Sequence, residues 1–257
     1  LCEVLEDFTR IMKEYQVDDY RVCATSAIRE TRNCLLILDK IRVRTGLEVE
    51  VLSNSEQRFL GYKSIASNEE SFQKIIQKGT AIVDVGGGSI QISLFDKDAL
   101  VSTQNLRLGT MRIRERLAEV ERQTTHYDEI IEEMINNELK SYKRLYLKDR
   151  EIKNMILVGD YLNHLTARRG KAKSTSFTRE EYMKLYKEIL SGSHQEMVER
   201  LGGISDNPSL VMPALIIYRK LIEETGAETI WVPGLSLSDG LAYDYAEQKK
   251  ILQPSHN

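Results

Sequence analysis

The sequence predicts an α/β protein of two domains, each built on a mixed sheet flanked by helices. Three short strand patterns follow one another between residues 80 and 106, as in an antiparallel meander. Helix and strand patterns then alternate to the end of the chain, which is typical of strands joined by helical crossovers. The first 78 residues show the same alternation without three opening strands. A length of 257 residues suits two domains of ordinary size.

The predicted first domain covers residues 1–78 and starts with an amphipathic helix. Apolar residues from Leu1 to Tyr15 recur at steps of three and four, and the stripe they form needs a sheet to cover it. In the second helix, Leu35, Leu36, Leu38 and Ile41 are expected to face inward. The elements predicted here are a helix at 1–15, a strand at 20–24, a helix at 30–44, a strand at 47–52 and a helix at 55–66.

The predicted second domain covers residues 79–257 and contains the meander. A capping box at Thr178–Glu181 marks the start of one of its helices. Its last helix is the one element that could pack back toward the first domain. The predicted strands are 80–85, 90–95, 100–106, 155–158 and 229–232, and the predicted helices are 110–120, 127–147, one from 178, 208–224 and 238–249.

Composition and charge exclude several classes of function. With 36 Lys and Arg against 39 Asp and Glu, the chain has no broad positive field that would draw it to nucleic acid or to a membrane. Any anion site must therefore be local. Three cysteines without metal-ligand spacing favour the reducing cytoplasm over a disulfide framework. No signal peptide or membrane-spanning run is visible, and because residue 1 is leucine we expect another segment to precede the chain.

A triple glycine between the first two strands of the meander is the clearest candidate for a ligand site. Gly86, Gly87 and Gly88 have no side chains, so backbone amides there can close on an anion, and Ser89 adds a hydroxyl. Asp84 ends the preceding strand, where a carboxylate can hold a divalent cation against a phosphate. The alternative is a tight hairpin turn with an aspartate cap.

Several segments, in order along the chain, resemble the exopolyphosphatase and guanosine pentaphosphate phosphohydrolase family, a branch of the actin and sugar-kinase superfamily. The glycine segment is similar to that family's D-x-G-G-G-S-x-E. The others are Ala24–Arg29, similar to A-T-x-A-x-R; Val51–Glu56, similar to I-S-G-x-E; Leu106–Arg112, similar to L-P-L-G-x-x-R; and Gly234–Gly240, near G-L-R-E-G.

The resemblance implies a duplicated fold of the actin-like ATPase or ribonuclease H-like type, with its first domain lacking the opening strands. It also implies Mg²⁺-dependent hydrolysis of a terminal phosphoanhydride bond in polyphosphate or guanosine polyphosphate, in a cleft between the domains. On this reading Glu56 activates the water, Arg29 neutralises phosphate oxygens and Asp84 binds Mg²⁺. Structural alternatives stay open, with Glu56 as a helix-start carboxylate and Arg29 in a surface ion pair.

The chain also departs from the family pattern. Gln91 stands where the family has glutamate, and it can neither act as a base nor bring a full charge to a metal. Gly159-Asp160-Tyr161 replaces a G-G-T turn, and Ser236–Asp239 replaces an L-R-E run. The family's opening D-x-G-S-N-S phosphate loop is absent. We therefore expect the 257-residue chain to be weakly active or inactive as it stands.

These departures leave three hypotheses. The first is an active phosphoanhydride hydrolase, the second is a binding protein for polyphosphate or guanosine polyphosphate with the same fold, and the third is a kinase-like relative that binds ATP. A basic loop with Arg168, Arg169, Lys171 and Lys173 either tracks a polyanion or is a solvated surface loop. The oligomeric state stays open, with a homodimer as one expectation.

Overall fold

A computed structural model describes residues 1–66, 69–118, 127–159, 162, 175–191, 196, 199–200 and 211–249. The chain divides into two compact units. Unit 1 consists of residues 1–60 and 242–257, and unit 2 of residues 61–241. The domain boundary expected between residues 78 and 79 stays a prediction.

Unit 2 is built on a six-stranded mixed sheet in the order β5-β4-β3-β6-β8-β7. Its first three strands form the predicted antiparallel meander, and β6 and β8 then join in parallel to β3. The edge strand β7 pairs antiparallel with β8. The strands are β3 (Thr80–Val85), β4 (Ile90–Asp96), β5 (Ala99–Leu106), β6 (Asn154–Val158), β7 (Thr175–Thr178) and β8 (Thr229–Val232).

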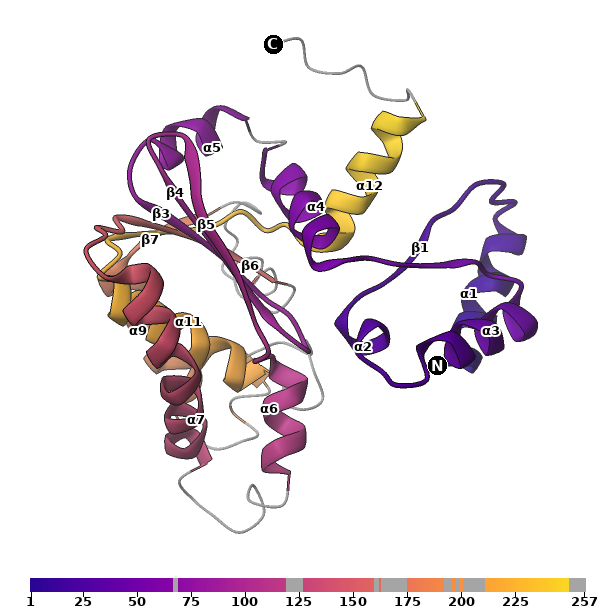
Figure 1. Ribbon diagram of the computed structural model, residues 1–257, viewed down its shortest axis with the longest axis horizontal. Coiled ribbons are helices and arrows are strands. Elements are labelled where there is room, and N and C mark those ends of the chain that lie inside the picture. Colours follow the sequence, from indigo (N-terminus) through magenta and orange to yellow (C-terminus); the bar gives the residue numbers. More distant parts are fainter. Residues whose placement is uncertain are drawn as a thin grey trace. The chain divides into compact units, whose positions relative to one another are not determined.

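Helices cover both faces of this sheet, because its strands carry apolar side chains on alternating sides. Val83, Ile92 and Leu157 belong to the larger core, beneath the helices seen together on one side in Figure 1. Ile82 and Ile156 point to the other face, with side chains of α4 (Asn54–Ala66) and α5 (Glu69–Ile76). The helices of the larger core are α6 (Thr110–Leu117), α7 (Tyr127–Tyr142), α9 (Arg179–Leu190) and α11 (Val211–Thr225).

Unit 1 contains a small parallel sheet of two strands, β1 (Val22–Ala24) and β2 (Val49–Val51). Its helices α1 (Cys2–Glu14) and α3 (Cys34–Thr45) pack against each other, with an ion pair between Arg44 and Glu6 at 2.7 Å. Its remaining elements are α2 (Ser26–Arg29), the start of α4 and the end of α12 (Leu237–Gln248).

The predicted elements are present with shifted ends, and the structure adds some that were not predicted. The helix expected at 30–44 is α3, which starts later, at Cys34, and the short helix α2 before it was not predicted. The helix expected at 127–147 ends in a π-helical turn, η1 (Lys143–Leu147). α5 was not predicted, and β7 begins within residues 167–176, the segment interpreted as a basic loop. The capping box of α9 is confirmed, since Thr178 and Glu181 exchange both hydrogen bonds.

The expected burial of α1 and α3 is wrong in part. Leu35 and Leu36, expected to face inward, are 82% and 66% exposed, whereas Ile41 is buried. In α1 the side chains of Val4 and Phe8 are also exposed. The reason lies in the size of the sheet in unit 1, because two strands of three residues offer little surface for a helix to cover.

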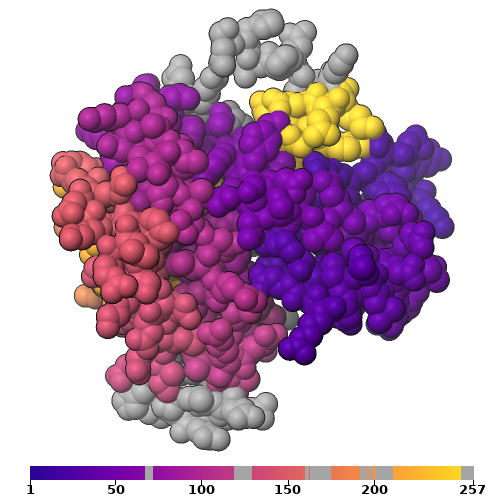
Figure 2. All heavy atoms as spheres, viewed as in Figure 1, coloured from indigo at the N-terminus to yellow at the C-terminus, as the bar shows by residue number. Residues whose placement is uncertain are grey.

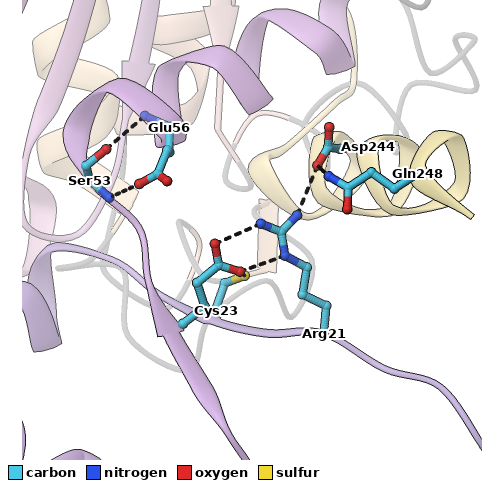
Figure 3. Close-up of polar contacts among 7 residues, drawn as sticks. Arg21, Cys23, Ser53, Glu56, Asp244 and Gln248 are labelled. Atoms are coloured by element: carbon cyan, nitrogen blue, oxygen red, sulfur yellow. Dashed lines mark hydrogen bonds and ion pairs between the residues drawn. The ribbon is translucent and has the colours of Figure 1, made fainter.

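An ion-pair network joins the two ends of the chain within unit 1. Arg21 donates from Nε and Nη2 to both carboxylate oxygens of Glu50, at 2.8 and 3.0 Å, and from Nη1 to Asp244 at 3.0 Å (Figure 3). Lys249 pairs with Asp19 at 2.5 Å. In Figure 2 the yellow atoms of α12 accordingly lie against indigo atoms of the N-terminal segment.

Replacing Arg21 by methionine is expected to lower the free energy of unfolding of unit 1 by about 2–3 kcal/mol, because it leaves the buried carboxylate of Asp244 without its cation. Urea unfolding followed by circular dichroism measures this. Arg10→Met is the matched control, since Arg10 pairs only with exposed carboxylates among the described residues and should change stability by less than about 0.5 kcal/mol. Equal effects of the two substitutions would contradict a structural role for the network.

Within the described residues, none of the helices combines the length and the apolar character needed to cross a bilayer.

Candidate phosphate-binding site

The triple glycine forms the tip of the hairpin between β3 and β4. Asp84 lies opposite Gln91 in the ladder, and Val85 lies opposite Ile90. The amide of Gly86 then donates to the carbonyl of Ser89 at 3.0 Å, which leaves Gly87 and Gly88 as a two-residue loop. We call residues 86–89 the glycine turn.

The carbonyls of the glycine turn are held by the first turn of α6. The amides of Thr110 and Met111 donate to the carbonyls of Gly86 and Gly87, at 3.1 and 2.9 Å. The amide of Arg112 also reaches Gly87, at 3.2 Å, and its Nε donates to the carbonyl of Gly88 at 3.0 Å. The first amides of a helix have no partner within the helix, so the glycine turn caps α6 in place of a side chain.

This capping decides the direction of the amides in the glycine turn. In a planar trans peptide the N–H points opposite to the C=O of the same unit, and the described chain has no cis peptide bond. With three consecutive carbonyls directed at α6, the amides of Gly87, Gly88 and Ser89 point away from it together. None of these amides donates a hydrogen bond to another described residue. The glycine turn therefore presents a nest of three amides, an arrangement of the kind that binds anions.

Glycine is needed in and beside this turn for space rather than for backbone angle. The glycines with positive φ in the described chain are Gly46, Gly159, Gly226 and Gly234, and none belongs to the glycine turn. A Cβ on Gly87 would lie 3.1 Å from Cγ of Met111. Side chains are thus absent where the turn packs on α6 and where an anion would approach the amides.

A row of polar side chains crosses the sheet beside the glycine turn. Asp84, Gln91 and Asn105 are paired across β3, β4 and β5 and so project from the same face. Gln91 is 5% exposed, and neither its Nε2 nor the Oδ1 of Asn105 has a hydrogen-bond partner within the described chain. The row therefore combines one carboxylate with two neutral amides.

The donor set suits a Mg²⁺ ion that is shared with a phosphate ligand. Among the described residues no three side chains of His, Cys, Asp or Glu gather into a metal site. Mg²⁺ commonly takes only one or two protein carboxylates and completes its shell with water and phosphate oxygens. Asp84, one carboxylate beside an anion nest, fits that arrangement.

Glu56 lies in the first turn of α4, and Arg29, the last residue of α2, reaches the start of α4 with its side chain. Glu56 accepts a hydrogen bond from the amide of Ser53 at 2.7 Å, and its own amide donates to Oγ of Ser53 at 3.1 Å (Figure 3). Arg29 donates to the carbonyl of Leu52 and to Oδ1 of Asn54, each at 2.5 Å. Glu56 thus has the helix-start role that the sequence left open, and among the described residues Arg29 binds this segment rather than a carboxylate partner.

The hydrogen bonds from the amide and hydroxyl of Ser53 lower the pKa of the Glu56 carboxyl below its ordinary value. The folded protein therefore holds Glu56 ionised at neutral pH, as a base must be. Stability contributed by these bonds is present above the ordinary glutamate pKa and is lost as the pH falls through the lowered pKa.

The structure brings the predicted site residues together in two groups. Asp84 and the glycine turn form one group in unit 2, and Glu56 and Arg29 form another in unit 1. A cleft that brings Glu56 to the glycine turn stays a prediction. Asp160 and the basic residues between 168 and 173 lie outside the described residues.

Two further residues, Ser236 and Arg112, have structural roles that the sequence did not indicate. Ser236 directly precedes α12, and its amide and its hydroxyl donate to Asp239 at 2.8 and 2.7 Å. The segment that replaces the family's L-R-E run is therefore a helix cap. Arg112 ends the segment similar to L-P-L-G-x-x-R, for which sequence reasoning supplies no role, and no pattern in the sequence indicates its contact with Gly88.

Comparison with known proteins shows which solved structures have a similar fold. A protein of Aquifex aeolicus, described as a member of the Ppx/GppA family, has a solved structure that is similar with a TM-score of 0.66 and 18% identity, covering 100% of this chain and 81% of that one. An exopolyphosphatase from Cytophaga hutchinsonii gives a TM-score of 0.75 at 17% identity, covering 96% of this chain and 80% of that one. These likenesses confirm the predicted α/β fold of the actin-like type.

A curated relative and a family match complete the comparison. The bifunctional 3-dehydroquinate synthase/phosphatase of Fusobacterium nucleatum is 22% identical over 189 residues, 71% of this chain, and the chain spans only 26% of its length. The Ppx/GppA phosphatase family matches residues 1–249. Since that match extends over nearly the whole sequence and the glycine turn lies within it, the chain belongs to the Ppx/GppA phosphatase family.

Proposed function

We propose that this protein hydrolyses terminal phosphoanhydride bonds in inorganic polyphosphate or guanosine polyphosphate, with Glu56 activating the water and Mg²⁺ assisting. The observation that carries the proposal is the nest of amides at Gly87, Gly88 and Ser89, which suits a phosphate with several charged oxygens. Membership of a phosphatase family supports the reaction class, and an exopolyphosphatase of similar fold supports polyphosphate as a substrate.

In the proposed reaction the glycine turn binds oxygens of the phosphate chain and keeps the terminal group in place. Arg29 neutralises charge on these oxygens with its planar guanidinium. Glu56 takes a proton from a water molecule, whose oxygen then forms a bond to the terminal phosphorus as the bond to the bridging oxygen breaks. Mg²⁺ held by Asp84 and the phosphate would supply positive charge for the leaving oxygen.

Release of orthophosphate from long-chain polyphosphate and from guanosine pentaphosphate, measured in the full-length protein with and without Mg²⁺, tests the proposal. We expect Mg²⁺-dependent release from at least one substrate, and the faster of the two identifies the preferred class. Binding of both polyanions without any release would exclude the hydrolase and select the second candidate.

That second candidate is a protein that binds the same polyanions without turning them over. The observation that favours it is Gln91, which brings a neutral amide to the place next to Asp84, with an Nε2 that has no hydrogen-bond partner among the described residues. A carboxylate at this place could attract a cation or accept a proton, and the amide can do neither.

Replacing Gln91 by glutamate is expected to increase Mg²⁺-dependent phosphate release at least about tenfold, because a second carboxylate beside Asp84 strengthens the cation site. Steady-state phosphate release at several Mg²⁺ concentrations measures the effect. Gln91→Met is the control for a change of size alone. Unchanged release with glutamate would show that position 91 does not limit the reaction.

A further inference from the structure

We propose that Arg112 is a positioning residue for the anion nest, acting from α6 on the peptide between Gly88 and Ser89. This inference rests on the proposed function, because it assigns a role in the same site. Arg112 Nε donates to the carbonyl of Gly88 at 3.0 Å, and its amide donates to the carbonyl of Gly87 at 3.2 Å. One residue thus holds two successive peptide units of the glycine turn.

The three peptide units of the nest are held in different ways. The carbonyls of Gly86 and Gly87 accept backbone amides of α6, which any side chain at those positions would leave in place. Within the described chain, the carbonyl of Gly88 accepts from the side chain of Arg112 alone. The direction of the Ser89 amide, which belongs to the same peptide unit, therefore depends on the residue at position 112.

The contact also changes the strength of the amide as a donor. A carbonyl that accepts a hydrogen bond from a cation is polarised, and the N–H of the same peptide becomes more positive. The first turn of α6 has the same effect on the peptides of Gly87 and Gly88, since the N-terminal end of a helix carries partial positive charge. α6 thus transmits positive potential through the glycine turn to the anion.

Arg112 acts through the peptide rather than on the phosphate. Its Nε lies on the carbonyl side of the glycine turn, and the amides of the nest point to the opposite side. Loss of Arg112 should therefore misalign one donor of the nest, an effect that differs from the loss of a charge nearby. Arg114, on the same helix, gives a matched control, because its removal deletes the same charge and within the described chain its side chain has no hydrogen bond to the glycine turn.

The experiment compares Arg112→Met with Arg114→Met and uses inorganic tripolyphosphate as the probe. Calorimetric titration is expected to show about tenfold weaker binding for Arg112→Met, the size of effect expected for one lost charge-assisted hydrogen bond, and less than about twofold for Arg114→Met. In the protein without ligand, the amide NMR signals of Gly88 and Ser89 should shift only in Arg112→Met. The tenfold loss should persist at high salt, because it arises from geometry rather than from long-range charge.

The outcomes separate the inference from the proposed function. If the unsubstituted protein binds tripolyphosphate and Arg112→Met binds it equally well, the positioning role is overturned and the function stands. If the unsubstituted protein does not bind, the proposed function fails, and the amide signals still decide whether Arg112 sets the turn. A loss that disappears at high salt would overturn the inference in favour of a general charge effect. Arg112→Gln, which keeps a polar side chain of shorter reach, replaces the methionine variant should that variant not fold.

Discussion

Replacing Glu56 by glutamine is expected to reduce phosphate release about 10²- to 10⁴-fold in the full-length protein, because glutamine cannot take a proton from water. At this position the substitution separates the two roles of Glu56, the helix cap and the proposed base. Glutamine oxygen can still accept the hydrogen bond from the amide of Ser53, so the cap of α4 is retained while the base is removed. Orthophosphate release under saturating substrate measures the change.

A second capping box in the chain supplies the control. Glu181 accepts from the amide of Thr178 at 2.8 Å, and this box begins α9 in unit 2. Glu181→Gln therefore makes the same chemical change in the same local motif and should leave release within about twofold. A similar loss in both variants would mean that the effect comes from helix stability, and the role of Glu56 as a base would have to be abandoned.

The pKa of Glu56 adds a second readout to this experiment. Because the hydrogen bonds from Ser53 lower this pKa, release in the unsubstituted protein should remain high to a pH below the ordinary glutamate pKa and then fall. In Ser53→Ala the bond from the hydroxyl is lost, and the acidic limb of the profile should move to higher pH.

Replacing Gly109 by alanine is expected to lower the free energy of unfolding of unit 2 by about 1–3 kcal/mol and to weaken tripolyphosphate binding at least tenfold. A Cβ at this position would lie 2.4 Å from the carbonyl oxygen of Gly87 and 2.6 Å from the carbonyl carbon of Gly88. Both are backbone atoms, so the glycine turn itself must move. The φ of Gly109 is −141°, which alanine adopts readily, and the whole effect therefore comes from contact.

Gly61→Ala is the matched substitution, since a Cβ on Gly61 would meet nothing within 4 Å. Gly61 lies inside α4, where alanine should raise stability by about 0.5–1 kcal/mol. Urea unfolding and calorimetric titration of the two variants compare stability with binding. Tight tripolyphosphate binding by Gly109→Ala would show that the packing of the glycine turn on α6 does not shape the site.

Local patterns predicted five of the six strands in the sheet of unit 2, all except β7, because these strands are short and separated by turn residues. The meander from Thr80 to Leu106 and the capping box at Thr178 have the form that the sequence indicates. The burial of Leu35 and Leu36 could not be predicted in this way. Periodicity shows that a helix has an apolar side, and it does not show whether the surface that would cover it is large enough.

The candidate site was predictable in its residue types and less so in its geometry. Three glycines after a strand suggested amides that bind an anion, but the direction of those amides depends on Arg112 and its helix, some 24 positions further along the chain. The role of Glu56 could not be decided from the sequence for another reason. The segment from Ser53 to Glu56 fits both a helix cap and a catalytic base.

The pairing of Arg21 with Asp244 also bears on the order in which the protein takes shape during synthesis. The ribosome makes Arg21 before unit 2, and Asp244 lies 223 positions further along the chain. All of unit 2 leaves the ribosome before Asp244 does. The ion pairs of unit 1 are therefore completed only after unit 2 has been made, although most of unit 1 is made before it. Until then the guanidinium of Arg21 has the neighbouring strand's Glu50 as its partner among these carboxylates.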